Sequence, residues 1–238
     1  MAVATPATQV GRTSAVTTLW RSNIGKKAVM AVTGIIMLLF LILHMAGNLK
    51  IFFGRDEFDS YAHWLRTIGS PVLHNAWFLW IQRFVLLVAI ALHAISAYQL
   101  SRRDLKARPA KYAHRLRPTA SYATNTMRFG GIIIGLFVIY HILDLTALVA
   151  NPNGVEGEAY DNVVADFSHW YIALAYIVAM LALCLHIAHG FWSAARTLGA
   201  VTSATRATAY KATAGVLAVV ITLGFLSVPI AVMAGLVD

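Results

Sequence analysis

The chain has little charge, and this shortage narrows the class of protein. Only 12% of its 238 residues are charged, whereas roughly a quarter is typical of water-soluble domains. Hydrophobic residues make up 59% of the chain. These proportions exclude an ordinary soluble globular protein. They predict an integral membrane protein with no room for a separate soluble domain.

Cysteine is nearly absent as well. The single residue of this type, Cys184, lies within an apolar run. One thiol excludes an internal disulfide, and it excludes an iron–sulfur cluster held by this chain, since such a cluster takes about four thiolates. The polar start of the chain also lacks the basic-then-apolar order of a signal peptide. We therefore predict a poorly ordered N-terminal tail over residues 1–21 and one transmembrane domain over residues 22–238.

Long apolar runs are what the chain has instead. A bilayer-spanning helix needs roughly 20 mostly apolar residues. Five segments are long enough, at about residues 28–53, 75–100, 127–149, 167–195 and 212–237. The sequence therefore predicts an all-α integral membrane protein, a bundle of five transmembrane helices.

The loops between these segments differ in charge, which predicts their orientation. Basic residues gather before the first segment, between the second and third, and after the fourth: Arg12, Arg21, Lys26, Lys27, Arg102, Arg103, Lys106, Arg108, Lys111, Arg115, Arg117, Arg196, Arg206 and Lys211. The loop between the third and fourth segments has four acidic residues and no basic one. Because basic loops stay on the cytoplasmic side, we expect a cytoplasmic N-terminus, with Asp238 outside.

Four histidines lie inside four different apolar segments: His44, His93, His141 and His186. An ionisable side chain within a membrane is costly without a partner, so each is a candidate functional residue. Imidazole is a standard axial ligand of haem iron. One histidine in each of four segments therefore suggests two metal centres, each held by two imidazoles.

Positions along the segments sort the four histidines by depth, at about 1.5 Å per residue. His44 and His141 lie close to the outer ends of their segments. His93 and His186 lie nine and ten residues before Arg102 and Arg196, which mark the inner side. We therefore expect an outer pair, His44 with His141, and an inner pair, His93 with His186. The plainer alternative is four unrelated histidines, each hydrogen-bonded to a neighbouring helix.

Several short motifs resemble one family. They read SNIGKK at 22–27, MAVTG at 30–34, HMAGNL at 44–49, LHA at 92–94, RFG at 128–130 and HIAHGFWS at 186–193. Together they resemble the di-haem cytochrome b subunit of succinate:quinone oxidoreductases, a family that includes succinate dehydrogenases and fumarate reductases. The resemblance covers all five apolar segments. The first and last motifs are specific, and the middle ones are weak alone.

The resemblance implies five transmembrane helices, two b haems and four axial ligands at His44, His93, His141 and His186. It also implies docking of a flavoprotein and an iron–sulfur subunit on the cytoplasmic side of a bacterial inner membrane. Electrons from succinate, oxidised on the partner flavoprotein, would cross the inner and then the outer haem to a membrane quinone. The chain departs from the family at Cys184, where some fumarate reductases carry a proton-transferring glutamate, and this departure favours succinate oxidation.

Three other readings stay open. The same scaffold serves a fumarate reductase that oxidises quinol, or anchors another membrane dehydrogenase or a hydrogenase. From a different class, a haem-free transporter would use its histidines to relay protons.

Other polar residues are weaker candidates. Arg83, Arg128 and Arg196 are possible partners of haem propionates, although snorkelling or topology explains them equally well. His189 competes with His186 as a ligand, but the family's glycine four residues after the ligand, here Gly190, favours His186. Asp144 has two interpretations: it leads protons to an outer quinone site, or it caps its helix in water. The second is the simpler one. His63, His74 and His169 lie near the outer surface, and His114 lies in the basic inner loop.

Overall fold

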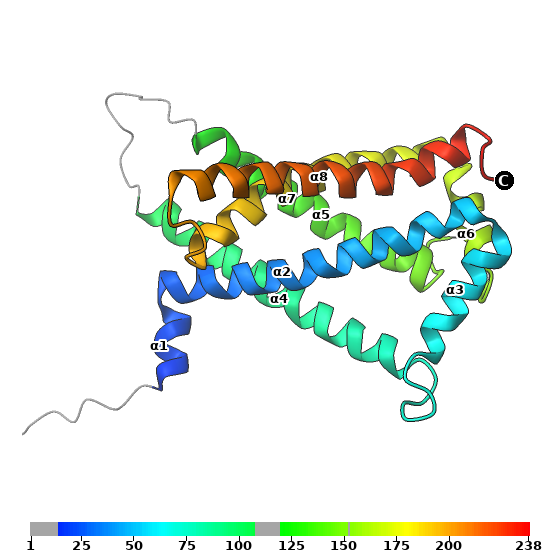
Figure 1. The fold of residues 1–238 in the computed structure, drawn as a ribbon, viewed down its shortest axis with the longest axis horizontal. Coiled ribbons are helices and arrows are strands. Elements are labelled where there is room, and N and C mark those ends of the chain that lie inside the picture. Colours follow the sequence, from blue (N-terminus) through cyan, green and yellow to red (C-terminus); the bar gives the residue numbers. More distant parts are fainter. Residues whose placement is uncertain (1–13, 108–119, 152) are drawn as a thin grey trace, which may run out of the picture.

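The computed structural model describes residues 14–107, 120–151 and 153–238, and this part of the chain is helical with no strand (Figure 1). Arg12, a basic residue near the N-terminus, lies outside the described residues. So does the middle of the basic inner loop: Arg108, Lys111, His114, Arg115 and Arg117.

Five long helices form the body of the described chain. They are α2 (Asn23–Asn48), α4 (Trp77–Lys106), α5 (Ala120–His141), α7 (Trp170–Thr197) and α8 (Ala204–Met233). A 3-10 turn, Leu49–Phe53, continues α2, and a π-helical turn, Ile142–Thr146, continues α5. All five are long and apolar enough to cross a membrane. The prediction of five apolar helices is therefore confirmed.

Capping groups, which a count of apolar residues ignores, set the helix ends. Helix α8 begins at Ala204, eight residues before the expected start at residue 212. The side chain of Ser203 caps it by accepting a hydrogen bond from the backbone N–H of Arg206. Helix α7 begins later than expected, at Trp170, because a separate short helix ends at Phe167.

Three short helices lie outside the spans, and hydropathy did not predict them. They are α1 (Ala15–Arg21), α3 (Arg55–Thr67) and α6 (Ala159–Phe167). Helix α1 occupies the last seven residues of the expected tail, because Ser14 caps its first turn. The expectation of a poorly ordered tail is therefore wrong for that part of the chain.

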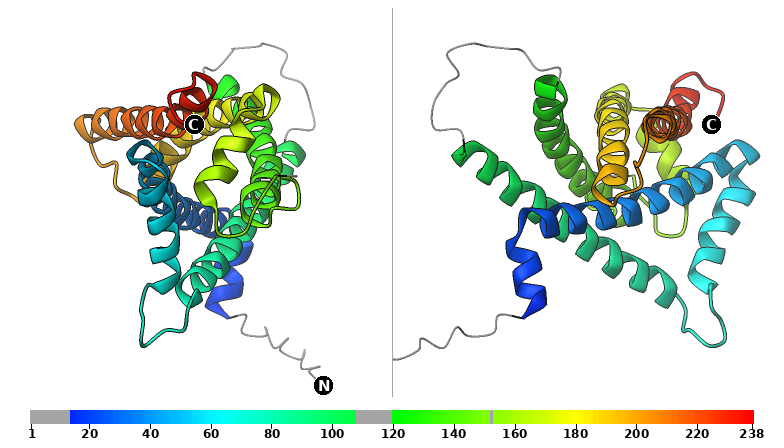
Figure 2. Two further views of the ribbon diagram at one scale, coloured as in Figure 1. Left: turned by 90° about the vertical axis from the view of Figure 1, so that its right-hand side faces the viewer. Right: turned by 60° about the vertical axis from the view of Figure 1, so that its left-hand side comes forward.

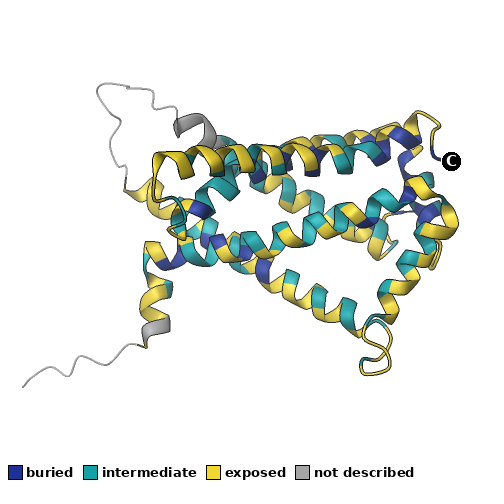
Figure 3. Ribbon diagram, viewed as in Figure 1, coloured by how far each residue is buried: buried dark blue, intermediate teal, exposed yellow. Residues whose placement is uncertain are grey.

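Helices α7 and α8 pack along one another and are the most buried of the spans (Figure 3). Small side chains, such as Ala173, Ala179 and Ala218, lie at or below 2% exposure in this seam and allow the close approach. Helix α2 packs on α4 and α7, and α5 packs on α7. Among the described residues, α4 and α5 are the least buried spans, and α4 diverges from the bundle toward α3 (Figure 2).

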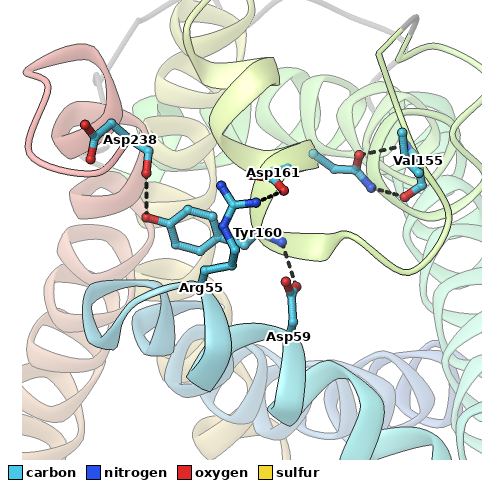
Figure 4. Close-up of polar contacts among 7 residues, drawn as sticks. Arg55, Asp59, Val155, Tyr160, Asp161 and Asp238 are labelled. Atoms are coloured by element: carbon cyan, nitrogen blue, oxygen red, sulfur yellow. Dashed lines mark hydrogen bonds and ion pairs between the residues drawn. The ribbon is translucent and has the colours of Figure 1, made fainter.

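A polar cap joins α3, α6 and the end of the chain at one end of the bundle (Figure 4). Arg55 of α3 forms an ion pair with Asp161 of α6. Asp59 accepts a hydrogen bond from the backbone N–H of Tyr160 at 2.9 Å. The Tyr160 hydroxyl donates to the backbone oxygen of Asp238 at 3.1 Å. The cap fixes the short helices over the N-terminal end of α7 and the C-terminal end of α8.

The two ends of the bundle differ in charge, which makes the predicted orientation testable. Labelling with a membrane-impermeant maleimide should modify Ser168→Cys in intact cells but Ser203→Cys only after permeabilisation, because the basic end is expected inside. Both serines are exposed, at opposite ends of α7. The parent chain, whose only thiol is the half-buried Cys184, is the background control. The reverse pattern would place the N-terminus outside.

Candidate metal centres

The four histidines within the spans meet as two pairs. The ring centres of His44 on α2 and His141 at the end of α5 are 5.9 Å apart. The ring centres of His93 on α4 and His186 on α7 are 6.1 Å apart. These are the outer and inner pairs that the depth of each histidine suggested.

The separation within each pair suits one metal between two imidazoles. A metal–imidazole bond is about 2 Å long, so rings that ligate one metal from opposite sides have centres roughly 6 Å apart. The ring planes are turned by 72° in the outer pair and 52° in the inner pair. Rotation about the nitrogen–metal–nitrogen axis leaves both bonds intact, so both angles are compatible with axial ligation.

Contacts along α2 place the pairs at two levels. His93 touches Met30 and Thr33, which precede His44 on the same helix by 14 and 11 residues. At about 1.5 Å per residue, the two levels lie roughly 16–21 Å apart along that helix. The two histidine pairs therefore lie at two different levels along the helix bundle.

The inner pair lies against two glycines, Gly34 and Gly131. The Nδ1 atom of His93 lies 3.0 Å from the carbonyl oxygen of Met30, a bond that fixes the tautomer and leaves Nε2 free to ligate. A Cβ at Gly34 would lie 3.4 Å from the His93 ring, and one at Gly131 would lie 3.9 Å from the His186 ring. The Nδ1 atom of His186 is buried with no hydrogen-bond partner.

The outer pair lies among aromatic rings. Phe40 and Phe225 lie beside His44, with ring centres 5.1 and 5.7 Å away, and Phe137 stacks on His141 at 5.8 Å. Such a shell excludes water and suits a large planar apolar group. The hydroxyl of Tyr176 lies 3.2 Å from Nδ1 of His141. As in the inner pair, this bond leaves Nε2 of His141 free.

Each pair joins helices that are not closely packed on one another. In the described part of the chain, α2 packs on α4 and α7, and α5 packs on α7, but neither α2 with α5 nor α4 with α7 forms a packed pair. The imidazoles therefore meet from helices whose backbones do not pack directly on one another. A macrocycle ligated between such helices has side chains to contact on both faces.

The donor set fits haem better than a bare metal ion. Among the described residues no group of three or more His, Cys, Asp or Glu side chains could hold a metal ion. A haem iron takes four nitrogens from its porphyrin and needs one or two axial ligands from the protein. Two imidazoles are therefore enough for a haem and too few for a typical zinc site.

The three candidate arginines do not gather at the histidine pairs. The exposed guanidinium of Arg83 lies over the ring of Trp80, 4.9 Å from its centre. Arg196 is also exposed and lies over Trp192 at 5.7 Å. Arg128, near the start of the third span, is half-buried. Contacts of these arginines with haem propionates stay predictions.

The other candidate histidines are not members of the two pairs. The ring that meets His93 is that of His186, as expected over His189. His63 and His74 are exposed on and after α3. His169, just before α7, borders a pocket of about 400 Å³ at the end of the bundle that carries α6.

The interpretation of Asp144 as a helix cap in water is wrong. Its side chain is fully buried, at 0% exposure, because the π-helical turn directs it into the bundle. The Tyr176 hydroxyl donates a hydrogen bond to its Oδ2 atom at 3.0 Å. Sequence reasoning missed Tyr176 altogether, because one tyrosine in an apolar helix gives no signal until its neighbours are known.

Sequence reasoning also missed Asp166, which was counted only as a loop charge. It is 3% exposed at the end of α6, and its carboxyl hydrogen-bonds to that of Asp144. Burial, followed by this bond and the charge of Asp144, raises the pKa of Asp166 to about 7.

Comparisons with known proteins add no relative. No protein-family model, curated protein or solved structure matches the chain. The case for its function therefore depends on its own residues and geometry.

Proposed function

We propose that the chain is the membrane-anchor cytochrome b subunit of a succinate dehydrogenase in a bacterial cytoplasmic membrane. In this proposal His44 with His141 and His93 with His186 are the axial ligands of two b haems. A flavoprotein subunit, which oxidises succinate, and an iron–sulfur subunit dock on the basic cytoplasmic end, and a membrane quinone accepts the electrons. When bound, the haems supply one-electron transfer between that iron–sulfur subunit and the quinone.

One observation supports the proposal most. Four histidines from four different helices meet as two pairs, at two depths, with ring separations that suit axial ligation. Four unrelated histidines would have no reason to meet in this way. Phenylalanine rings flank both members of the outer pair, which suits a large apolar cofactor between the two imidazoles.

The chain's own residues have separable tasks in this function. The imidazoles bind iron, and the Met30 carbonyl and the Tyr176 hydroxyl orient two of the rings. The aromatic shell of the outer pair keeps water away. Basic residues at the other end attract an acidic docking surface. In the described chain these include Arg21, Lys27, Arg102, Arg103, Lys106, Arg206 and Lys211.

An absorption spectrum of the purified full-length chain tests the proposal. Reduction should produce the sharp bands of six-coordinate b haem, and extraction should yield two haems per chain. A chain expressed with adequate haem that shows no such bands is not a cytochrome, and the transporter reading then takes its place.

Two further measurements separate the remaining alternatives. Co-purification with a flavoprotein and an iron–sulfur protein that oxidise succinate supports the proposed complex, whereas different partners indicate another dehydrogenase or a hydrogenase. A comparison of succinate-driven quinone reduction with quinol-driven fumarate reduction gives the preferred direction. Cys184, at the position of the proton-transferring glutamate of some fumarate reductases, favours the first.

A further inference from the structure

Two acidic side chains meet inside the outer end of the bundle without a cation. Asp144 and Asp166 are 0% and 3% exposed. One oxygen of each, Oδ1 of Asp144 and Oδ2 of Asp166, is buried with no donor from any other group. The two ion pairs formed among the described residues, Lys50 with Glu57 and Arg55 with Asp161, involve neither carboxyl.

Two carboxylates in contact strongly disfavour being ionised together in a buried site, so the pair keeps a shared proton up to about pH 7, the pKa of Asp166, and loses it only above that pH. Protonated Asp166 donates its hydrogen bond to Asp144, and this bond satisfies the oxygens that otherwise have no donor. The Tyr176 hydroxyl satisfies the other oxygen of Asp144. Below about pH 7 the pair therefore holds one proton and one negative charge, and above that pH Asp166 is free to bind a proton.

A chain of hydrogen bonds joins this pair to the outer candidate centre. The Tyr176 hydroxyl has one hydrogen, which it donates to Asp144 at 3.0 Å, so it accepts the hydrogen on Nδ1 of His141 at 3.2 Å. Charge on the pair is thus one tyrosine away from a candidate axial ligand. In a low-dielectric interior such a chain transmits electrostatic changes strongly.

The other side of the pair opens toward the outside. Asp166 borders the outer pocket of about 400 Å³, together with Tyr140, Asn151, His169 and Tyr171. The pocket has an opening and several polar groups, so water in it has hydrogen-bond partners on the way to Asp166. The proton of the pair therefore has a path to the outer solution that avoids the apolar core.

We propose that Asp166, paired with Asp144, is a proton-exchange site that takes up a proton through the outer pocket when the outer haem is reduced and releases it when that haem is oxidised. The coupling of proton exchange to the redox state of the outer haem rests on the proposed function. One electron enters from the proposed iron–sulfur partner, and one proton from outer water binds the carboxylate of Asp166. Oxidation reverses both, so charge is balanced in each direction.

Other polar and charged groups lie on the elements around Asp166. Near its carboxyl are Asp144 of the π-helical turn, Tyr140 of α5, Tyr171 and Tyr176 of α7, and His169 before α7. The charged residues of the adjoining polar cap are Asp161 of α6 and Arg55 and Asp59 of α3. Asp161 is already paired with Arg55, and Asp59 accepts from a backbone N–H.

A redox titration of the two haems at several pH values tests the coupling. In the parent protein the midpoint potential of the outer haem should fall as the pH rises above about 7, the pKa of Asp166. Reduction raises that pKa further, so a proton is bound on reduction within this window. When one proton is fully coupled to one electron, the midpoint potential falls by about 59 mV per pH unit. This is the potential that corresponds to a tenfold change in an equilibrium constant for one electron. The Asp166→Asn variant should lose at least half of this slope.

Asp161→Asn is the matched control, because it removes an acidic group from the same helix but outside the pair. Its outer haem should keep the parental slope. An unchanged slope in Asp166→Asn, or an equal loss in Asp161→Asn, would overturn the assignment.

Infrared spectroscopy tests the proton independently of haem. The carbonyl stretch of a protonated carboxylic acid should be present in the parent chain near neutral pH, shift on transfer to D₂O and disappear in Asp166→Asn. Absence of the band in the parent refutes the shared proton even if the variant fails to fold. A parent chain that shows the band but binds no haem refutes the proposed function and the coupling, and leaves only the carboxyl pair.

Discussion

His44→Ala and His93→Ala should each bind one haem per chain instead of two, and each should lose a different haem. The reason is that the two residues belong to different pairs, whose rings meet 5.9 and 6.1 Å apart with their own partners. A haem held by one axial imidazole from the protein loses its six-coordinate spectrum and much of its affinity. Haem extraction with a reduced-minus-oxidised spectrum measures both losses.

The double variant His44→Ala/His93→Ala should bind no haem. In contrast, His44→Ala/His141→Ala should still bind one, since both residues belong to the outer pair. His63→Ala is the control, because His63 is exposed on α3 outside both pairs, and it should keep two haems. Two haems in either single variant would show that the ligand assignment is wrong.

Haem depletion should destabilise the chain strongly. A ligand that binds only the folded state at a thousandfold excess over its Kd stabilises that state by about 4 kcal/mol. Two such sites amount to a large part of the stability of a bundle whose α4 and α5 bury few residues of their own. We expect chain from haem-starved cells to unfold roughly 10 °C lower for each missing haem, at about 2–4 °C per kcal/mol.

Thermal unfolding of the purified chain, followed by circular dichroism, measures this effect. The His44→Ala variant should lie between the haem-replete and haem-depleted parents, because it lacks one of the two ligand pairs. Limited proteolysis should cut next to α4 and α5 before it cuts between α7 and α8, which pack on one another without a cofactor. Equal unfolding temperatures for all three samples would mean that no haem bridges these helices.

Hydropathy and histidine spacing predicted the number of spans and the pairing of the imidazoles, because both depend on position along single helices. Bilayer thickness sets the length of a span, and the rise per residue converts position into depth. The pairing of His44 with His141 therefore needed no knowledge of side-chain contacts.

The carboxyl pair could not be predicted in this way, because it depends on contacts between elements distant in the sequence. Asp144 looks like a solvated helix end until the π-helical turn directs it inward. Asp166 looks like a loop charge until α6 brings it to Asp144. Neither the short helix nor the turn has a signal in mean hydropathy, so the acidic site became visible only in three dimensions.

The low burial of α4 and α5 also bears on how this protein should be handled. In a bilayer, many apolar side chains of these two helices would have acyl chains as neighbours, since side chains such as Phe84, Leu87, Phe129 and Leu136 are more than 60% exposed. Extraction replaces those neighbours with detergent, and these two helices carry His93 and His141. Spectra and potentials therefore belong in lipid nanodiscs, with a micelle as the comparison that reveals how far the surrounding lipid holds each imidazole in place.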